Sequence, residues 1–142
     1  MTKHDVVEVL LVEDNPQDAE LTVRAFKRQN LINTLHHVTD GEQALDFFFT
    51  QNQPNPRVVL LDLKLPKVNG LEVLEQLRAN PRTREVPVVI LTSSKEDKDL
   101  EKAYALGANS YIVKPVDFNN FAHAVGQLGM YWLLLNQPPD YT

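Results

Sequence analysis

Five polar or charged side chains follow short apolar segments that lie far apart in the sequence. Glu13 and Asp14 close the first segment, and Asp62, Thr92 and Lys114 close later ones. In an open parallel sheet, ligands bind outside the carboxyl ends of the strands, so these side chains would meet at one edge. Alone, an acid there most often caps a turn or the next helix, and a lysine is usually a solvated charge. The combination favours a functional site.

Three carboxylates at one edge would repel one another and raise one another's pKa values. A hard divalent cation removes that cost, and Mg²⁺ prefers a few carboxylates together with water and phosphate oxygens. The cation would shield Asp62 so that its carboxylate attacks an electrophilic phosphorus and forms an aspartyl phosphate. Lys114 would hold one phosphoryl oxygen as a point charge, and the Thr92 hydroxyl would bond another. The pattern therefore predicts phosphoryl transfer supported by positioning and charge neutralisation.

The elements that must position these residues alternate along the chain. Continuous runs of Val, Leu and Ile indicate strands buried on both faces, namely Val6–Val12, Arg57–Leu61, Pro87–Leu91, Ser110–Val113 and, more weakly, Asn33–Val38. Helical patterns lie between and after them, namely Pro16–Gln29 with Asn15 as N-cap, a segment from Asp40 to Phe49, Gly70–Asn80, Lys95–Leu106 and Asp117 to about Leu135. The repetition predicts an α/β fold, a doubly wound five-stranded parallel sheet of flavodoxin-like order 2-1-3-4-5.

The composition is that of one soluble globular domain. The chain has 142 residues, of which 43% are hydrophobic and 23% charged, and these values are ordinary. A net charge of −5 argues against binding to nucleic acid or to an anionic membrane through a basic face. The absence of cysteine excludes disulfides and thiolate metal sites. With no apolar signal or membrane-spanning stretch, we expect a cytoplasmic protein.

The stretches VEVLLVEDNP, VVLLDLKLPKVNG, VPVVILTSS and NSYIVKP resemble, in this order, the receiver domains of two-component response regulators. The spacing of Asp62, Thr92 and Lys114 agrees with that family. The resemblance covers about residues 6–128 of a single domain spanning residues 1–142. It implies that Asp62 is the phosphoacceptor and that a histidine kinase is the donor. It also implies a signalling protein that catalyses only its own phosphorylation and dephosphorylation, so we do not expect an enzyme.

The resemblance also implies roles for neighbouring residues. Mg²⁺, or another divalent cation, would be bound by a set comprising Asp14, Asp62, the backbone carbonyl of Lys64 and, through water, Glu13. Thr92 would be the switch hydroxyl and Tyr111 the switch aromatic residue. Phosphorylation would draw Thr92 toward the phosphoryl group and remodel the face formed by the fourth helix, fifth strand and fifth helix, where a partner reads the signal.

The C-terminal part of the chain narrows the resemblance. The segments YWLLLNQPP and NPRTREVPVVILT resemble the small response regulators of cyanobacterial and other bacterial phytochromes, which stand alone without an output domain. They imply a phytochrome-type histidine kinase as donor. Residues 129–142, a helix extension and tail, are too short for an output domain. Because Met130–Leu135 is apolar all round, we expect a symmetric homodimer through the face from the fourth helix to the C-terminal helix.

Two other functions fit an aspartate at the end of a parallel strand. A haloacid-dehalogenase-like phosphatase also forms an aspartyl phosphate, but that family resembles DxDxT, and the run Asp62–Pro66 lacks the second acid. A phosphate-independent pseudo-receiver would act as a binding module, although such proteins usually lose the acceptor or an acid. For the histidines we expect surface or packing roles, since no metal-ligand spacing is present, at positions 4, 36, 37 and 123.

Overall fold

The structure is a computed structural model that describes residues 7–29, 35–51 and 53–130. The strands are β1 (Val9–Val12), β2 (Leu35–Val38), β3 (Val58–Asp62), β4 (Val88–Thr92) and β5 (Ser110–Val113). The helices are α1 (Pro16–Arg28), α2 (Gly41–Phe49), α3 (Gly70–Ala79), α4 (Lys98–Ala105) and α5 (Phe118–Gln127). All strand pairs are parallel, and the order β2-β1-β3-β4-β5 confirms the predicted topology.

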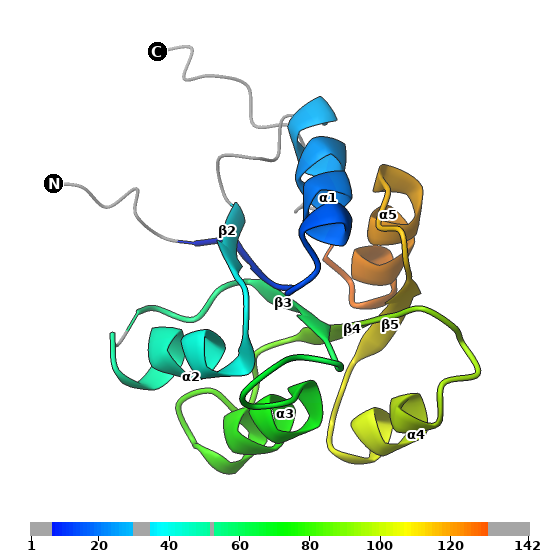
Figure 1. Ribbon diagram of the computed structural model, residues 1–142. Coiled ribbons are helices and arrows are strands. Elements are labelled where there is room, and N and C mark those ends of the chain that lie inside the picture. The colour runs from blue at the N-terminus through cyan, green and yellow to red at the C-terminus, as the bar shows by residue number, and fades with distance from the viewer. Residues whose placement is uncertain (1–6, 30–34, 52, 131–142) are drawn as a thin grey trace, which may run out of the picture.

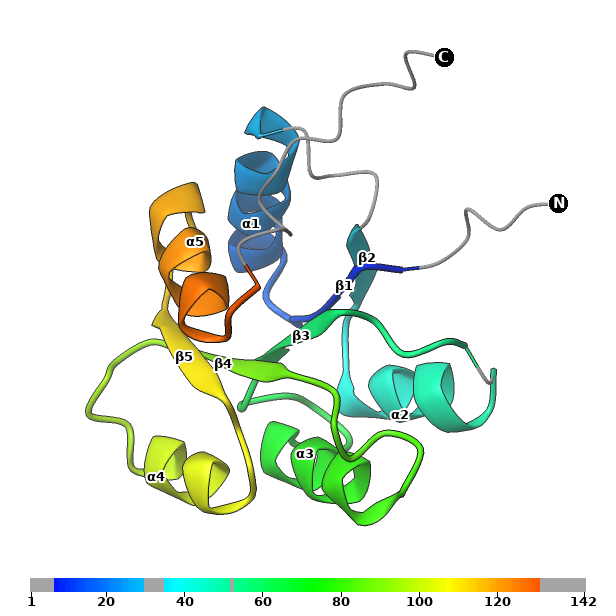
Figure 2. The same cartoon turned by 180° about the vertical axis from the view of Figure 1, so that it is seen from behind.

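The sheet separates two layers of helices, with α1 and α5 on one face and α2, α3 and α4 on the other (Figures 1 and 2). Alternate residues of each strand enter opposite cores. Leu10 and Val12 pack in the cluster that includes Phe47, whereas Val9 and Leu11 pack in the cluster that includes Phe26. Because both faces are covered, β1 has no polar side, which explains its continuous apolar run.

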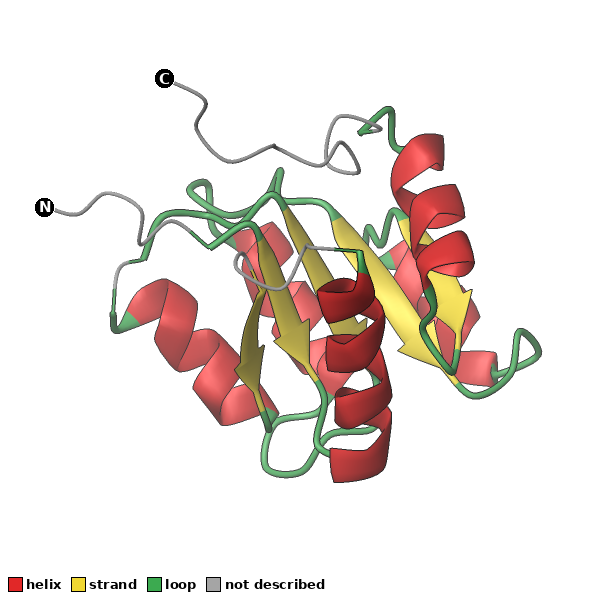
Figure 3. Ribbon diagram, turned by 90° about the horizontal axis from the view of Figure 1, so that it is seen from above, coloured by secondary structure: helices red, strands yellow, loops and turns green. Residues whose placement is uncertain are grey.

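The helices begin where capping side chains close the turns that follow the strands. Asn15 Oδ1 accepts a hydrogen bond of 2.9 Å from the Asp18 N–H, and Asp40 and Asp117 cap α2 and α5 in the same way, as predicted. The prediction for α4 was three residues too early. Asp97 Oδ1 accepts the Asp99 N–H at 2.9 Å, so that helix begins at Lys98 rather than at Lys95. These turns lie at the edge of the sheet where the strands end, toward which the yellow arrows point in Figure 3.

The prediction that the last helix continues to about Leu135 is wrong, because α5 ends at Gln127. Gly129 adopts φ 73°, and two terminal hydrogen bonds reverse the chain. The Gly129 N–H donates to the Gly126 carbonyl at 2.9 Å and the Met130 N–H to the Val125 carbonyl at 2.8 Å. This is the Schellman pattern, and glycine is favoured there because it adopts positive φ without a steric penalty. Residues 131–135 of the apolar stretch lie outside the described residues, and no described helix is long and apolar enough to cross a membrane.

Gly70 allows α3 to begin directly against the end of β3. A Cβ at this position would lie 2.5 Å from the Asp62 carbonyl oxygen and 2.5 Å from the Leu63 Cα, which are both backbone atoms. We therefore expect Gly70→Ala to lower the free energy of unfolding by about 2–3 kcal/mol in urea denaturation, since the loop that carries Asp62 must shift. Gly129→Ala is the matched control, because its Cβ would meet nothing within 4 Å. It should cost only the positive-φ penalty of about 1–2 kcal/mol, and an equal or larger loss there would contradict the steric explanation.

Candidate functional site

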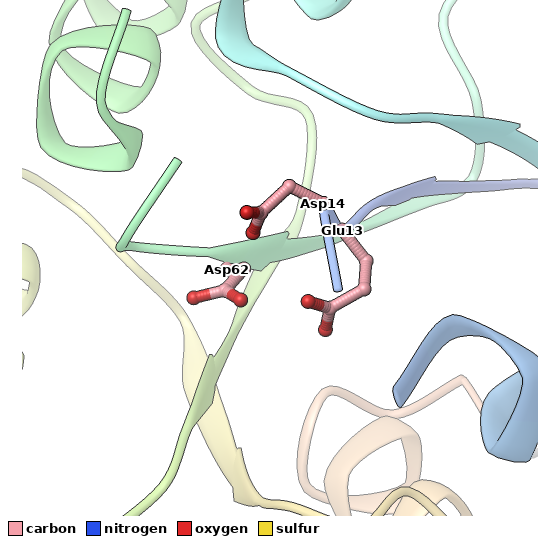
Figure 4. A group of neighbouring side chains, drawn as sticks. All are labelled: Glu13, Asp14 and Asp62. Atoms are coloured by element: carbon pink, nitrogen blue, oxygen red, sulfur yellow. The ribbon is translucent and has the colours of Figure 1, made fainter. Parts of the chain in front are cut away.

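Three carboxylates converge at the carboxyl ends of the adjacent strands β1 and β3 (Figure 4). Glu13 and Asp14 follow β1, Asp62 is the last residue of β3, and Val12 pairs with Leu61 in the sheet. One oxygen from each carboxylate lies within 4.8 Å of the others. Glu13 is 1% and Asp62 6% exposed, whereas Asp14 is exposed. The cluster is therefore open to solvent on the side of Asp14 and buried at Glu13 and Asp62.

Lys114 enters the cluster from the end of β5. Its Nζ lies 2.7 Å from Asp62 Oδ2, 3.0 Å from Glu13 Oε1 and 3.1 Å from Asp18 Oδ2. Its backbone N–H donates to the Thr92 carbonyl at 2.8 Å, and a cis peptide bond joins it to Pro115. The predicted approach of the ammonium to the acids is present, and a fourth carboxylate, that of Asp18, takes part.

Burial and mutual repulsion shape the charge state of the cluster. Burial, followed by the neighbouring Asp62 carboxylate, raises the pKa of Glu13 from its ordinary value of 4.5 to about 7. For Lys114, burial acts to lower the pKa, but hydrogen bonds and charge attraction from Asp62 and Glu13 outweigh it and raise the pKa. The lysine therefore remains a cation, and Glu13, the most buried carboxyl of the cluster, is the group whose pKa rises.

The residues present fit a divalent cation. The donors are hard carboxylate oxygens, which are the ligands that Mg²⁺ and Mn²⁺ take in proteins. Glu13 Oε1 is buried and accepts no hydrogen bond from the described residues, although the Lys114 ammonium lies beside it. Of the predicted ligands, Lys64 follows in the next loop, and its N–H donates to Asp62 Oδ1 at 3.0 Å. One Asp62 oxygen is thus held by the backbone and the other by Lys114.

Without divalent cations, the contribution of Glu13 to the free energy of unfolding is expected to decrease between about pH 4.5 and about pH 7. In this window the unfolded chain has released the proton that the folded chain still holds, so stability falls as pH rises. Other carboxyl groups titrate nearby, so the quantity to measure is the difference between wild type and Glu13→Gln in urea denaturation. The glutamine variant should gain relative stability across the window, and a difference independent of pH would contradict the raised pKa.

The two predicted switch residues lie on neighbouring strands, Thr92 at the end of β4 and Tyr111 within β5. Thr92 is 3% exposed, and its Oγ1 donates to the Ser94 carbonyl at 2.9 Å, with Asp97 Oδ2 at 3.4 Å. Tyr111 is half-buried, and its ring meets that of Tyr104 edge-on at 6.4 Å between centroids. The Thr92 hydroxyl is therefore bonded within its own loop, and Tyr111 packs between β5 and α4.

Sequence reasoning missed two residues that contact the site. Asp18 reads as a favourable acid in the first turn of a helix, and nothing local distinguishes it from other such acids. His37 was expected to have a surface or packing role, but its Nε2 lies 2.8 Å from the Glu13 carbonyl oxygen. Its neighbour His36 instead stacks on Phe47, at 5.6 Å between centroids. The only available signal was that His37 stands near the carboxyl end of its strand, beside Leu11 of β1.

Comparison with known families gives the same assignment as the site. The model described as response regulator receiver domain matches residues 9–126, a range that contains all of the predicted site residues. This chain belongs to the response regulator receiver domain family. The receiver domains of this family are signalling modules that work with histidine kinases, and the resemblance read from the sequence is confirmed.

The relatives of this receiver domain include regulators of phytochrome systems. The bacteriophytochrome response regulator RtBRR is 51% identical with a TM-score of 0.81, covering 94% of this chain and 84% of that chain. Response regulator Rcp1 of Synechocystis sp. is 35% identical over 88% of both chains. Its Mn(2+)-bound form has a TM-score of 0.71 at 33% identity, covering 93% and 98%. A probable methanogenesis regulatory protein, FilR2 of Methanothrix harundinacea, is 43% identical over 92% of this chain and 86% of its own.

Proposed function

We propose that this receiver domain takes a phosphoryl group from the phosphohistidine of a histidine kinase onto Asp62 and then presents an altered face to a partner. The observation that carries the proposal is the position of the Asp62 carboxylate. Lys64 N–H holds Oδ1 at 3.0 Å and Lys114 Nζ holds Oδ2 at 2.7 Å, at the open edge of the sheet. A carboxylate held in this way approaches a phosphorus atom without first having to be oriented.

In the transfer, an Asp62 oxygen forms the new P–O bond while the P–N bond to the kinase histidine breaks. The imidazole nitrogen leaves with the electron pair of that bond. The Asp62 carboxylate charge is lost, so the Lys114 hydrogen bond that it accepted becomes available to a phosphoryl oxygen, as a charge-assisted contact. The Thr92 hydroxyl would leave the Ser94 carbonyl and take another phosphoryl oxygen. The chain positions groups and balances charge, and it needs no general acid or base of its own.

A divalent cation would be held by the predicted set of Glu13, Asp14, Asp62 and the Lys64 carbonyl. When bound, it supplies positive charge that offsets the crowded carboxylates and the incoming phosphoryl oxygens. The close approach of three carboxylates and the Mn(2+)-bound form of the relative Rcp1 support this assignment.

The output would be a change in the face formed by α4, β5 and α5. As Thr92 moves toward the phosphoryl group, the Tyr111 ring would turn into the space beside it. Two large apolar side chains on α4 and β5 are already exposed, Tyr104 at 43% and Val113 at 37%, which supports a protein contact there. A homodimer through this face and the C-terminal segment remains part of the proposal.

The donor proposed is a phytochrome-type histidine kinase. The likeness to the bacteriophytochrome response regulator RtBRR supports it, whereas the name of FilR2 links that relative to methanogenesis. Phosphotransfer from a purified bacterial phytochrome kinase, compared with unrelated histidine kinases at equal concentration, tests the choice. Faster transfer from the phytochrome kinase supports it, and preference for another kinase class overturns it.

Incubation with acetyl phosphate and Mg²⁺, followed by intact-mass measurement and peptide mapping, tests the acceptor itself. One phosphoryl adduct is expected on Asp62, absent with EDTA and absent in Asp62→Asn, because the amide cannot attack phosphorus. Asp46→Asn is the matched control, because Asp46 is a half-buried residue of α2 whose carboxylate accepts a hydrogen bond from Gln51, and it should be phosphorylated normally. Failure to form the adduct with acetyl phosphate or with any kinase would identify the chain as a phosphate-independent binding module.

A further inference from the structure

Asp18 occupies a position in the site that differs from that of the other acids. It lies in the first turn of α1, where its N–H donates to the Asn15 cap at 2.9 Å. Its Oδ2 lies 3.1 Å from Lys114 Nζ. The side chain is 33% exposed, compared with 0% for Glu13 and 8% for Asp62, so Asp18 contacts the ammonium from the solvent side.

An ammonium group has three N–H donors, and in this structure three carboxylates share them. Two of these carboxylates, Glu13 and Asp62, belong to the group of acids close enough to hold one cation, whereas Asp18 does not. A cation bound between the strands would therefore compete with Lys114 for two of its partners. Only the carboxylate of Asp18 would remain entirely available to the lysine.

We propose that Asp18 is a positioning residue that receives the Lys114 ammonium when a divalent cation binds, and so raises the affinity of the site for that cation. This inference rests on the proposed cation site. Without Asp18, the ammonium has no third carboxylate to move toward and stays on Glu13 and Asp62, where it repels the incoming ion. With Asp18, it remains beside Asp62, ready for a phosphoryl oxygen.

The first experiment is calorimetric titration of the full chain with Mg²⁺ alone. Asp18→Asn keeps the size of the side chain and leaves the backbone bond to Asn15 in place, but it removes the charge that attracts Lys114. We expect its affinity for Mg²⁺ to fall about 10-fold, the low end of the range over which outer-shell partners act. Glu20→Gln is the matched control, since it makes the same charge change on the same helix at a side chain that pairs with Arg24 instead. Its affinity should change less than about 2-fold, as expected for a screened surface charge.

A double-mutant cycle separates positioning from simple charge. In a Lys114→Met background, Asp18→Asn should weaken Mg²⁺ binding no more than Glu20→Gln does, because the group through which it acts is gone. If Asp18→Asn lowered the Mg²⁺ affinity as much in that background as it does in the wild-type background, the proposal would be overturned, since Asp18 would then act on the ion by charge alone. An Asp18→Asn affinity equal to that of the control in the wild-type background would overturn it as well. If the wild-type chain bound no Mg²⁺, the proposed cation site would fail together with this inference.

Discussion

Replacing Lys114 with methionine should lower the free energy of unfolding by about 3 kcal/mol at pH 8 without divalent cations, the low end for breaking a buried ion pair. The change leaves the buried Glu13 and Asp62 carboxylates without the ammonium that lies within 3.0 Å of both. The loss should be smaller at pH 6, because Glu13, with a pKa already raised to about 7, takes up a proton and removes one of the repelling charges. Urea denaturation at the two pH values measures both effects.

Mg²⁺ should restore much of the lost stability in Lys114→Met, because the ion supplies the missing positive charge and binds only the folded chain. Lys95→Met is the matched control, since it removes a lysine from the exposed turn before α4. It should change stability by less than about 0.5 kcal/mol, as surface substitutions usually do. A loss in Lys114→Met that did not depend on pH, or that Mg²⁺ left unchanged, would show that packing, and not charge, explains the effect.

Replacing Asp14 with asparagine should weaken Mg²⁺ binding by at least about 100-fold, the upper end of the effect of even outer-shell partners. Asp14 is the exposed member of the three-carboxylate group, and the resemblance implies that it binds the ion directly. The variant should fold at least as well as wild type, since one of three repelling charges is gone. Titration with Mg²⁺, or with Mn²⁺ followed by its magnetic resonance signal, measures the affinity. Phosphorylation by acetyl phosphate should fall in parallel.

Glu20→Gln, the control variant on α1 described above, is also the control for the Mg²⁺ affinity of Asp14→Asn. If Asp14→Asn bound Mg²⁺ as tightly as this control, the cation would have to be held elsewhere, and the ligand set proposed for the site would be wrong. If it lost stability instead, Asp14 would have a structural role that the repulsion argument does not include.

The order of the strands and the edge that carries the site followed from local pattern. Residues of β1 alternate between two apolar cores, so a continuous apolar run implies helices on both faces, and this class of sheet places its ligand site at the carboxyl ends of the strands. The ends of the helices were predicted less accurately than their order. The end of α5 was placed at about Leu135 because apolar residues continue past Gly129, whereas a glycine at positive φ with two reversing hydrogen bonds ended the helix.

The contacts among the site residues could not be predicted in the same way. Lys114 and Asp18 are 96 positions apart in the chain, and their contact depends on the position of the first turn of α1 relative to the end of β5. The Thr92 hydroxyl bonds the Ser94 carbonyl because the loop after β4 brings that oxygen within 2.9 Å, a detail of loop geometry that no local pattern encodes.

The amino-acid sequence by itself determined the fold class, the strand order and the acids, threonine and lysine at the strand ends of the functional edge, because periodicity, capping and strand ends are local properties of the chain. Only the tertiary structure decided that Lys114 pairs with Asp18 of α1 and that the His37 ring lies beside the Glu13 carbonyl oxygen. It also decided that Glu13 is buried deeply enough to raise its pKa. Those outcomes depend on distances of about 3 Å between side chains on different elements, and packing sets such distances only when the whole sheet and its helices are assembled.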